Sequence, residues 1–399
     1  MPPLDVLGDV AFPTRPFVGP GRVLLGAGAS GSLAQELVAA GVDPSAGSVI
    51  VVPDAAVVAL GLAAPALASL EAAGFDVVSG PPVEAEPTPE VVRAFLPDRA
   101  AARVAAVVGI GGGSAMDAAK LVSVAIANEI DLTQVFPPGL ELRPGPLVAL
   151  VPTTAGTGAE ATVVAMLWHE GAKRIFVHPH LVPDVAVLDP DLLRALPPHV
   201  TAAGGLDAIS HAMESLLSTF STPLTQWAAG SALRNLARWL PVAYDEGTPE
   251  SRAGTLLGAY EAGLALNAGV VLGHSLAYTI ASRARLGHGV TCAMALPYCL
   301  AYNRTAADDR LAAIAAAVGI EGGGEELVGW VADLAARLAT PASLAAVGIG
   351  AGDLPEMARE CVELYPRPGS PMPLEAGRIE RVLACFLEGD ARGAWAAMA

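Results

Sequence analysis

The stretch Val107–Lys120 reads VVGIGGGSAMDAAK and contains the change of pattern on which the N-terminal half is built. An apolar, β-branched run passes into three glycines and a serine, and an alanine-rich run of helical type follows directly. Glycines at 111–113 would let the backbone approach a pyrophosphate, and the amides at the start of the helix would favour that anion. The alternative interpretation is an ordinary strand-to-helix turn.

Short β-branched runs and alanine-rich runs alternate on both sides of this stretch. The predicted strands are 22–25, 48–53, 75–79, 105–110, 146–151 and 185–188, and the predicted helices include 32–40, 63–73, 90–95 and 114–127. Such alternation predicts a mostly parallel sheet covered on both faces, with ligands bound beyond the carboxyl ends of its strands.

Two further features lie at predicted strand ends. Pro152–Glu160, PTTAGTGAE, offers three hydroxyls on a flexible turn and is suited to line the same crevice. Asp54 ends the strand 48–53, where a carboxylate can bind both ribose hydroxyls of NAD and repel a 2′-phosphate. The alternatives are an ordinary turn for the first and a turn-initiating aspartate for the second. Gly26–Gly31, GAGASG, also fits G-x-G-x-x-G, but a lone glycine pattern is weak, and we interpret it as a structural turn.

Strand patterns disappear after about residue 200. The predicted helices of the second half are 228–238, 253–268, 272–283, 292–303, 307–318, 325–338, 353–363 and 378–386. We therefore expect an α/β domain over residues 1–197 and an all-helical domain over residues 198–399. Lys173 lies in 171–177, which has the pattern of one further strand at the edge of the first domain.

Thr201–Leu216 reads TAAGGLDAISHAMESL and predicts a buried helix that opens behind Gly204 and Gly205. Asp207 and His211 are four residues apart, so both project from one face of that helix. A carboxylate and an imidazole in this arrangement can hold a divalent cation if other ligands arrive from elsewhere. The alternative is a helix-start carboxylate hydrogen-bonded to a core histidine.

Two histidines are the candidates for those other ligands. His274 lies in an apolar predicted helix, and His288 stands between two glycines, a context more typical of a site than of a core. The other four histidines occur in turn-like contexts and are expected at the surface; they are His169, His178, His180 and His199.

Composition limits the classes of function. With 53% hydrophobic and 16% charged residues, the 399-residue chain is expected to be ordered and globular. A net charge of −17 disfavours nucleic acid and anionic membranes as partners. The four cysteines lack metal-type or redox spacing, no leader peptide is evident, and the longest apolar run, 55–70, is interrupted by Gly61 and Pro65. We therefore expect a cytoplasmic protein.

Taken together, the motifs resemble those of the iron-containing (group III) alcohol dehydrogenases over nearly the whole chain. They are GGGSxxDxAK at 111–120, PTTAGTGxE at 152–160, GLDxxxH at 205–211, His274 (63 residues after His211, 274 − 211), His288 (14 residues further, 288 − 274) and YPRP at 365–368. The resemblance implies a dinucleotide-binding domain, a helical domain and a cleft between them. It also implies a homodimer.

The resemblance also assigns residues. The implied metal ligands are Asp207, His211, His274 and His288, with Fe²⁺ expected first and Zn²⁺ second. The implied contacts to NAD are Asp54, Gly112, Gly113, Ser114, Asp117, Thr153, Thr154, Thr157 and Lys173.

Some positions depart from the family pattern. Many members have a second histidine where this chain has Tyr278, so we expect that tyrosine to serve as the proton relay. Gly287 stands where proline is common, and Glu86 where asparagine is frequent. Arg283 and Arg285 could present cations to an acidic substrate, or be solvated residues at a helix end.

The expected function is interconversion of a small primary alcohol, diol or hydroxy acid with its aldehyde or ketone, with NAD as the hydride acceptor. A glycerol-type or polyol dehydrogenase and a nucleotide-binding protein without catalysis are the alternatives. A dehydroquinate-synthase-like lyase is disfavoured because the chain has only two lysines, Lys120 and Lys173. Maleylacetate reductases are disfavoured because they do not keep this set of four ligands.

Overall fold

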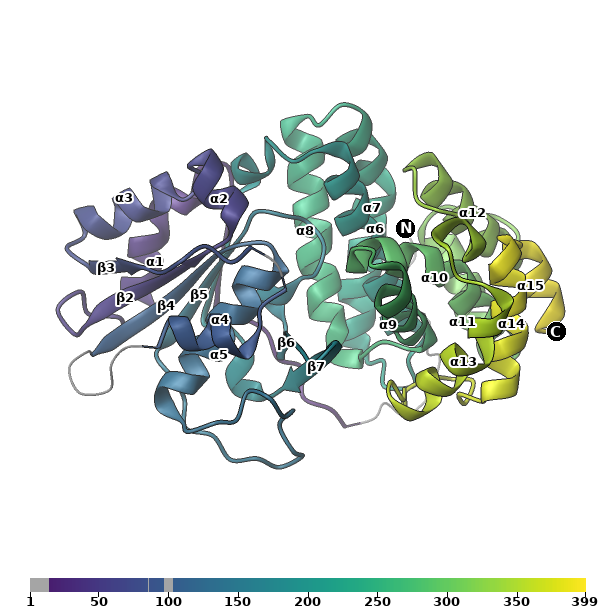
Figure 1. Ribbon diagram of the computed structural model, residues 1–399. Helices are drawn as coiled ribbons and strands as arrows, with labels where there is room; N and C mark the ends of the chain where they lie inside the picture. Colours follow the sequence, from purple (N-terminus) through teal and green to yellow (C-terminus); the bar gives the residue numbers. More distant parts are fainter. Residues whose placement is uncertain (1–13, 85, 97–102) are drawn as a thin grey trace. The chain divides into compact units, whose positions relative to one another are not determined.

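The computed structural model describes residues 14–84, 86–96 and 103–399 (Figure 1). The chain divides into two compact units. One is Val18–Leu196, and the other is Pro197–Ala399 together with residues 14–17. The first contains the strands, and the second is helical, as the sequence predicts.

The α/β unit is built on a parallel six-stranded sheet of order β1-β8-β5-β4-β2-β3. Its strands are β1 (Arg22–Leu25), β2 (Ser48–Pro53), β3 (Asp76–Ser79), β4 (Val104–Gly111), β5 (Leu147–Pro152) and β8 (Val185–Leu188). The β-branched runs of β2, β4 and β5 are buried along most of their length, as expected for a sheet covered on both faces. The predicted doubly covered parallel sheet is confirmed.

Helices cover this sheet on both faces (Figure 1). They are α1 (Leu33–Ala39), α2 (Ala55–Leu60), α3 (Ala64–Ala72), α4 (Pro89–Ala94) and α5 (Gly113–Ala127). The most buried is α5, which packs against β2, β4 and β5. It begins at Gly113, the last residue of Gly111–Gly113, which we call the glycine loop. The glycine loop thus lies at the carboxyl end of β4, in the middle of the sheet.

An antiparallel hairpin, β6 (Val164–His169) with β7 (Ala172–Val177), lies outside this sheet. The sequence pattern predicts the second of these strands and does not predict β6. Glu170 and Gly171, which connect the strands, both have positive φ (51° and 76°), as a two-residue type I′ turn requires. The pair Glu-Gly lacks the asparagine or aspartate that usually marks such a turn, which is why the hairpin was not recognised.

Every regular element of the described part of the second unit is helical. Its α-helices are α6 (Pro198–Leu217), α7 (Pro223–Asp245), α8 (Pro249–Ala265), α9 (Leu272–Ala284), α10 (His288–Tyr302), α11 (Arg304–Ala317), α12 (Gly324–Arg337), α13 (Leu354–Glu363), α14 (Ala376–Glu388) and α15 (Ala391–Ala397). Within the described ranges, no single helix is both long and apolar enough to cross a membrane. One pair, Pro249–Ala268 and Leu272–Ala284, meets that test only when joined across a 108° bend.

Helix α6 corrects one expectation. It does not open behind Gly204 and Gly205 but begins at Pro198, and it runs through both glycines. Proline is favoured in the first turn of a helix because its missing N–H would have no partner there. A Cβ on Gly205 would lie 2.2 Å from Cδ1 of Leu240 on α7, so this glycine permits close packing of two helices.

Candidate metal centre and cofactor loops

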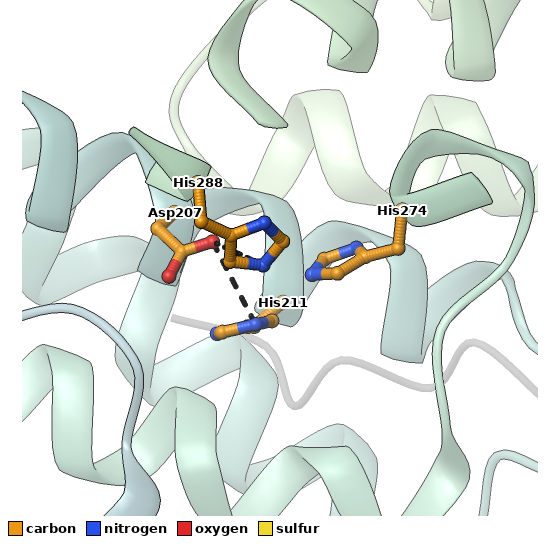
Figure 2. A group of neighbouring side chains, drawn as sticks. All are labelled: Asp207, His211, His274 and His288. Atoms are coloured by element: carbon orange, nitrogen blue, oxygen red, sulfur yellow. Dashed lines mark ion pairs between the residues drawn. The ribbon is translucent and has the colours of Figure 1, made fainter. Parts of the chain in front are cut away.

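Four side chains of the helical unit converge on one point (Figure 2). Asp207 and His211 project from α6, His274 from the first turn of α9, and His288 is the first residue of α10. One potential ligand atom from each lies within 4.8 Å of all the others. These are the four residues for which the sequence resemblance implied a metal, and we call them the quartet.

The quartet has the geometry of a divalent-metal site. Nε2 of His211 and Nε2 of His288 are each 3.8 Å from Oδ1 of Asp207, too far for a hydrogen bond. Oδ1 of Asp207 and Nε2 of His274 are buried and have no hydrogen-bond partner among the described residues. Each such atom costs about 1–3 kcal/mol. Three imidazoles and one carboxylate form a donor set that suits Fe²⁺ or Zn²⁺, so these residues fit a divalent metal.

The charges of the quartet favour the same conclusion. Burial raises the pKa of the Asp207 carboxyl, but the imidazoles of His211, His288 and His274 oppose burial and hold that pKa below its ordinary value. The carboxyl group is therefore ionised at neutral pH, as a metal ligand must be.

Glu214, which the sequence analysis did not single out, orients one of these histidines. Its Oε1 lies 2.5 Å from Nδ1 of His274. Its Oε2 accepts hydrogen bonds from the backbone amides of Val271 (2.8 Å) and His274 (3.3 Å). A carboxylate that accepts from Nδ1–H leaves Nε2 for the metal and fixes the plane of the ring. Glu214 follows His211 by three residues and is 1% exposed, so a buried acid on the ligand-bearing face was the available signal.

Tyr278 lies one turn after His274 on α9, and its ring stacks on His288 with 5.4 Å between centroids. It is 4% exposed. Burial raises the pKa of its phenol well above 10, although Arg367 opposes this effect. The hydroxyl therefore stays protonated at neutral pH. Its expected role as a relay remains a prediction.

Arg283 is already engaged by acids of its own unit. Its guanidinium contacts Glu360 at 2.7 and 2.9 Å and Glu356 at 3.1 Å, which ties α9 to α13. Arg285 is exposed at the end of α9. Arg283 is thus neutralised within the fold, which favours the interpretation of this segment as a helix end.

Asp54 has a local partner for each carboxylate oxygen. Its Oδ1 accepts from the amide of Val57 at 2.7 Å and caps α2, and its Oδ2 accepts from the amide of Gly112 at 2.8 Å. Asp54 therefore holds the glycine loop in place. Each oxygen keeps one further lone pair, so the predicted contact to ribose is compatible with this arrangement.

The two predicted cofactor loops of the α/β unit lie against each other. A Cβ on Gly113 would be 2.8 Å from Cγ2 of Thr157, and a Cβ on Gly112 would be 3.5 Å from Oγ1 of Thr154. The amide of Thr153 donates to the carbonyl of Gly111 at 3.0 Å, which continues the pairing of β4 with β5. Ser114, in the first turn of α5, is half-buried. Glycine is thus required at position 113, whereas a Cβ at position 112 would make only an ordinary van der Waals contact.

Asp117 and Lys173, the remaining predicted cofactor contacts, have protein partners in this structure. Oδ2 of Asp117 accepts from the amide of Met166 at 3.0 Å. Burial raises the pKa of Asp117 to about 6, with Lys120 and Lys173 opposing. Nζ of Lys173 is 2.6 Å from Oε1 of Glu86. For Lys173 to contact a ribose, it would have to share or release Glu86.

The Gly26–Gly31 turn already contains an anion of the protein itself. The carboxylate of buried Asp189 accepts from the amides of Gly28 (2.9 Å) and Ser30 (3.0 Å) and from Oγ of Ser30 (2.6 Å). Gly28 has a φ of 76°. These contacts agree with the interpretation of GAGASG as a structural turn.

The histidines outside the quartet are not uniformly at the surface. His199 is exposed, whereas His169, His178 and His180 are half-buried. Nε2 of His178 lies 3.1 Å from the carbonyl oxygen of Leu140. The prediction of surface exposure is therefore correct for His199, whereas the other three histidines are less exposed than predicted.

Comparison with known families covers both units. The family model described as iron-containing alcohol dehydrogenase matches residues 20–190, and the model described as Fe-containing alcohol dehydrogenase family, C-terminal, matches residues 201–386. The chain belongs to the iron-containing alcohol dehydrogenase family. As a member of this family it is an alcohol oxidoreductase, and the resemblance drawn from its motifs is confirmed.

Individual members of the family are similar over most of their length. Long-chain-alcohol dehydrogenase 1 of Geobacillus thermodenitrificans (strain NG80-2) is 34% identical over 369 residues, which cover 86% of this chain and 90% of the relative. Maleylacetate reductase of Rhizobium sp. (strain MTP-10005) is 34% identical over 381 residues, which cover 94% and 99%. Among solved structures, an alcohol dehydrogenase from Oenococcus oeni has a TM-score of 0.86 at 25% identity and covers 94% of this chain and 100% of its own.

Proposed function

We propose that this alcohol oxidoreductase is a metal-dependent, NAD-linked dehydrogenase that interconverts a small primary alcohol, diol or hydroxy acid with its aldehyde or ketone. The observation that carries the proposal is the quartet, in which Oδ1 of Asp207 and Nε2 of His274 are buried without a hydrogen-bond partner among the described residues. Fe²⁺ is the first expectation because of the family, and Zn²⁺ suits the same donors.

The proposed mechanism assigns separate roles to the quartet, to Glu214 and to Tyr278. Asp207, His211, His274 and His288 would hold the metal, which when bound supplies a Lewis acid for the oxygen of the alcohol or carbonyl group. Glu214 keeps the His274 ring in its orientation. In alcohol oxidation the hydroxyl of Tyr278 would accept the proton of the alcohol oxygen and give its own proton to solvent, and in carbonyl reduction the proton would move in the opposite direction.

Support for NAD comes from the α/β unit. The glycine loop ends at the start of α5, where the amides and the helix dipole favour a pyrophosphate. The carboxylate of Asp54 lies beside this loop and would repel the 2′-phosphate of NADP. The first feature supports a dinucleotide of either kind, and the carboxylate of Asp54 supports NAD over NADP.

The proposal also includes a homodimer and a cytoplasmic location. The first rests on the resemblance to the family, and the second on four cysteines without disulfide or metal spacing. Analytical ultracentrifugation of the purified protein tests the dimer, because the molar mass obtained for a monomer would be half that of a dimer.

Two substrate classes compete within the family. The similarity to a long-chain-alcohol dehydrogenase and the complete quartet favour an uncharged alcohol. The similarity to maleylacetate reductase, which is equal in identity, favours an acidic carbonyl compound. We favour the alcohol because the quartet is complete and Arg283 is already paired with acids.

The test is an activity panel with protein purified without oxygen and supplied with Fe²⁺ or Zn²⁺. The panel contains primary alcohols of increasing length, diols, hydroxy acids and maleylacetate, each with NAD(H) and NADP(H). The proposal predicts turnover of at least one alcohol with NAD and weaker turnover with NADP. Turnover of maleylacetate alone, in protein whose metal has been removed by a chelator, would contradict it.

A further inference from the structure

Lys120 is a fully buried lysine (0% exposed) that the mechanism above does not use. It lies on α5, seven residues after the glycine at which the helix begins. Its Nζ donates to the carbonyl of Thr162 (2.9 Å), to Oγ1 of Thr162 (3.1 Å) and to the carbonyl of Val164 (2.9 Å). An ammonium group has three N–H donors, and each has an acceptor here. A buried charge is tolerated only with such partners, so this arrangement is specific.

The three acceptors lie where the chain leaves the threonine loop, Pro152–Glu160. The entry of that loop is fixed by the sheet, because Thr153 donates to the carbonyl of Gly111. The last residues of the loop form a short 3-10 turn, Ala159–Ala161, which leads to Thr162. The sheet thus holds the loop at its entry, and Lys120 holds the chain just beyond its exit.

The glycine loop and Lys120 belong to one continuous segment. Gly111–Gly113 lead directly into α5, and Lys120 lies two turns into that helix. Asp117, one turn before Lys120, accepts from the amide of Met166 and adds a second contact to the same departing chain. Two carboxylates, those of Asp117 and Glu160, lie close enough to stabilise the charge of the ammonium.

We propose that Lys120 is a positioning residue that fixes the threonine loop against the glycine loop and so pre-organises the dinucleotide site. The proposal rests on the proposed NAD linkage. Lys120 need not touch the cofactor, because its three donors are used within the protein. Without the ammonium, the exit of the threonine loop would be held by fewer contacts, and NAD would have to order the loop at the expense of binding free energy.

The experiment compares Lys120→Met with a matched control, Ser123→Ala. Ser123 lies on the same helix and is 2% exposed, and its Oγ donates to the carbonyl of Pro146 at 2.6 Å, outside the threonine loop. Both variants lose a buried hydrogen-bonding group of α5. Only the first loses the contact to the chain that leaves the threonine loop.

The first measurement is NADH affinity by fluorescence titration. We expect Lys120→Met to raise the Kd by about tenfold or more, while Ser123→Ala stays within about twofold of the wild type. The KM for NAD should rise in parallel, with kcat at saturating NAD within about threefold, because bound cofactor restores the loop order. Metal content should not change, since the quartet consists only of residues of the other unit. Lys120→Arg should recover part of the affinity.

A second readout follows the loop without cofactor. Hydrogen–deuterium exchange of the amides of residues 153–166 should be faster in Lys120→Met than in Ser123→Ala. If Lys120→Met does not fold, Thr162→Val replaces it; this variant removes only the Oγ1 acceptor and should raise the Kd by about two- to threefold.

The outcomes separate the two proposals. A folded Lys120→Met protein, or the substitute Thr162→Val, with wild-type affinity for NADH and wild-type exchange overturns the role of Lys120 alone. A correctly folded wild-type protein that binds no NADH contradicts the NAD linkage, and the role of Lys120 falls with it.

Discussion

Oε1 of Glu214 lies 2.5 Å from Nδ1 of His274, and both side chains are almost completely buried. The same carboxylate accepts from two backbone amides at the start of α9, so it fixes both the ring of His274 and the helix that carries it. Gly273 is part of this arrangement, because a Cβ there would lie 2.6 Å from Oε1 of Glu214. The orientation of one quartet histidine therefore depends on a residue outside the quartet.

Replacement of Glu214 by alanine should weaken metal binding. Without the carboxylate, Nδ1 of His274 loses its hydrogen-bond partner, and the ring is no longer fixed in its orientation. The Kd of the metal should therefore rise by about 10- to 100-fold. Competition with a chromogenic chelator measures this change. Glu261→Ala is the matched control, since Glu261 is also buried but bonds to Ser231 and Asn235 between α7 and α8. Equal metal affinity in the two variants would remove Glu214 from the role.

Tyr278→Phe tests the proton relay. The substitution keeps the ring that stacks on His288 and removes only the hydroxyl, so metal content should be unchanged. If the hydroxyl passes the proton, kcat should fall by about 100-fold or more. Steady-state kinetics and metal analysis of this variant measure the two quantities. A kcat equal to that of the wild type would assign proton transfer to another group.

Asp54→Asn tests cofactor choice. The amide is neutral, so the repulsion of a 2′-phosphate disappears, and the ratio of kcat/KM for NAD over NADP should fall by about tenfold. Asp189→Asn is the control, because Asp189 holds a similar glycine turn that we do not assign to the cofactor. An unchanged ratio in Asp54→Asn would show that Asp54 does not select between NAD and NADP. Its role would then be limited to the hydrogen bonds that it accepts from Val57 and Gly112.

Glu160 makes stability depend on pH. Burial raises its pKa from 4.5 to about 7, with Lys120 opposing. Its contribution to stability is therefore fully present below pH 4.5 and is lost as the pH rises through about 7. Between these limits the free energy of unfolding of the wild type should fall relative to that of Glu160→Gln by at most about 3 kcal/mol. Urea unfolding of both metal-free proteins at pH 4.5 and pH 7.5 measures the difference. A constant difference would show that the pKa of Glu160 is the same in the folded and the unfolded protein.

Only part of the site could be predicted from the sequence. The spacing of Asp207 and His211 places both side chains on one helix face, which is compatible with two metal ligands and equally with a carboxylate bonded to a core histidine. His274 and His288 lie far along the chain, and only the resemblance to a family joined them to the first pair. Glu214 was missed, because its partner is a ring that folding brings to it from 60 residues away.

The sequence predicted those helices and strands that follow a repeating pattern of residues. It did not predict features that depend on contacts between elements. The buried strands β2, β4 and β5 follow from their β-branched runs. The pair Gly204-Gly205 looked like the start of a helix, but Gly205 makes room for Leu240 of a neighbouring helix, which no local pattern reveals. The ion pair of Lys173 with Glu86 likewise joins residues that are distant in sequence.

The most direct test of the account is metal analysis combined with an activity assay, on wild-type protein and His274→Ala purified without oxygen. We expect about one Fe or Zn per wild-type chain and NAD-dependent oxidation of an alcohol, with both nearly abolished in His274→Ala. Full activity in a metal-free His274→Ala protein would contradict it.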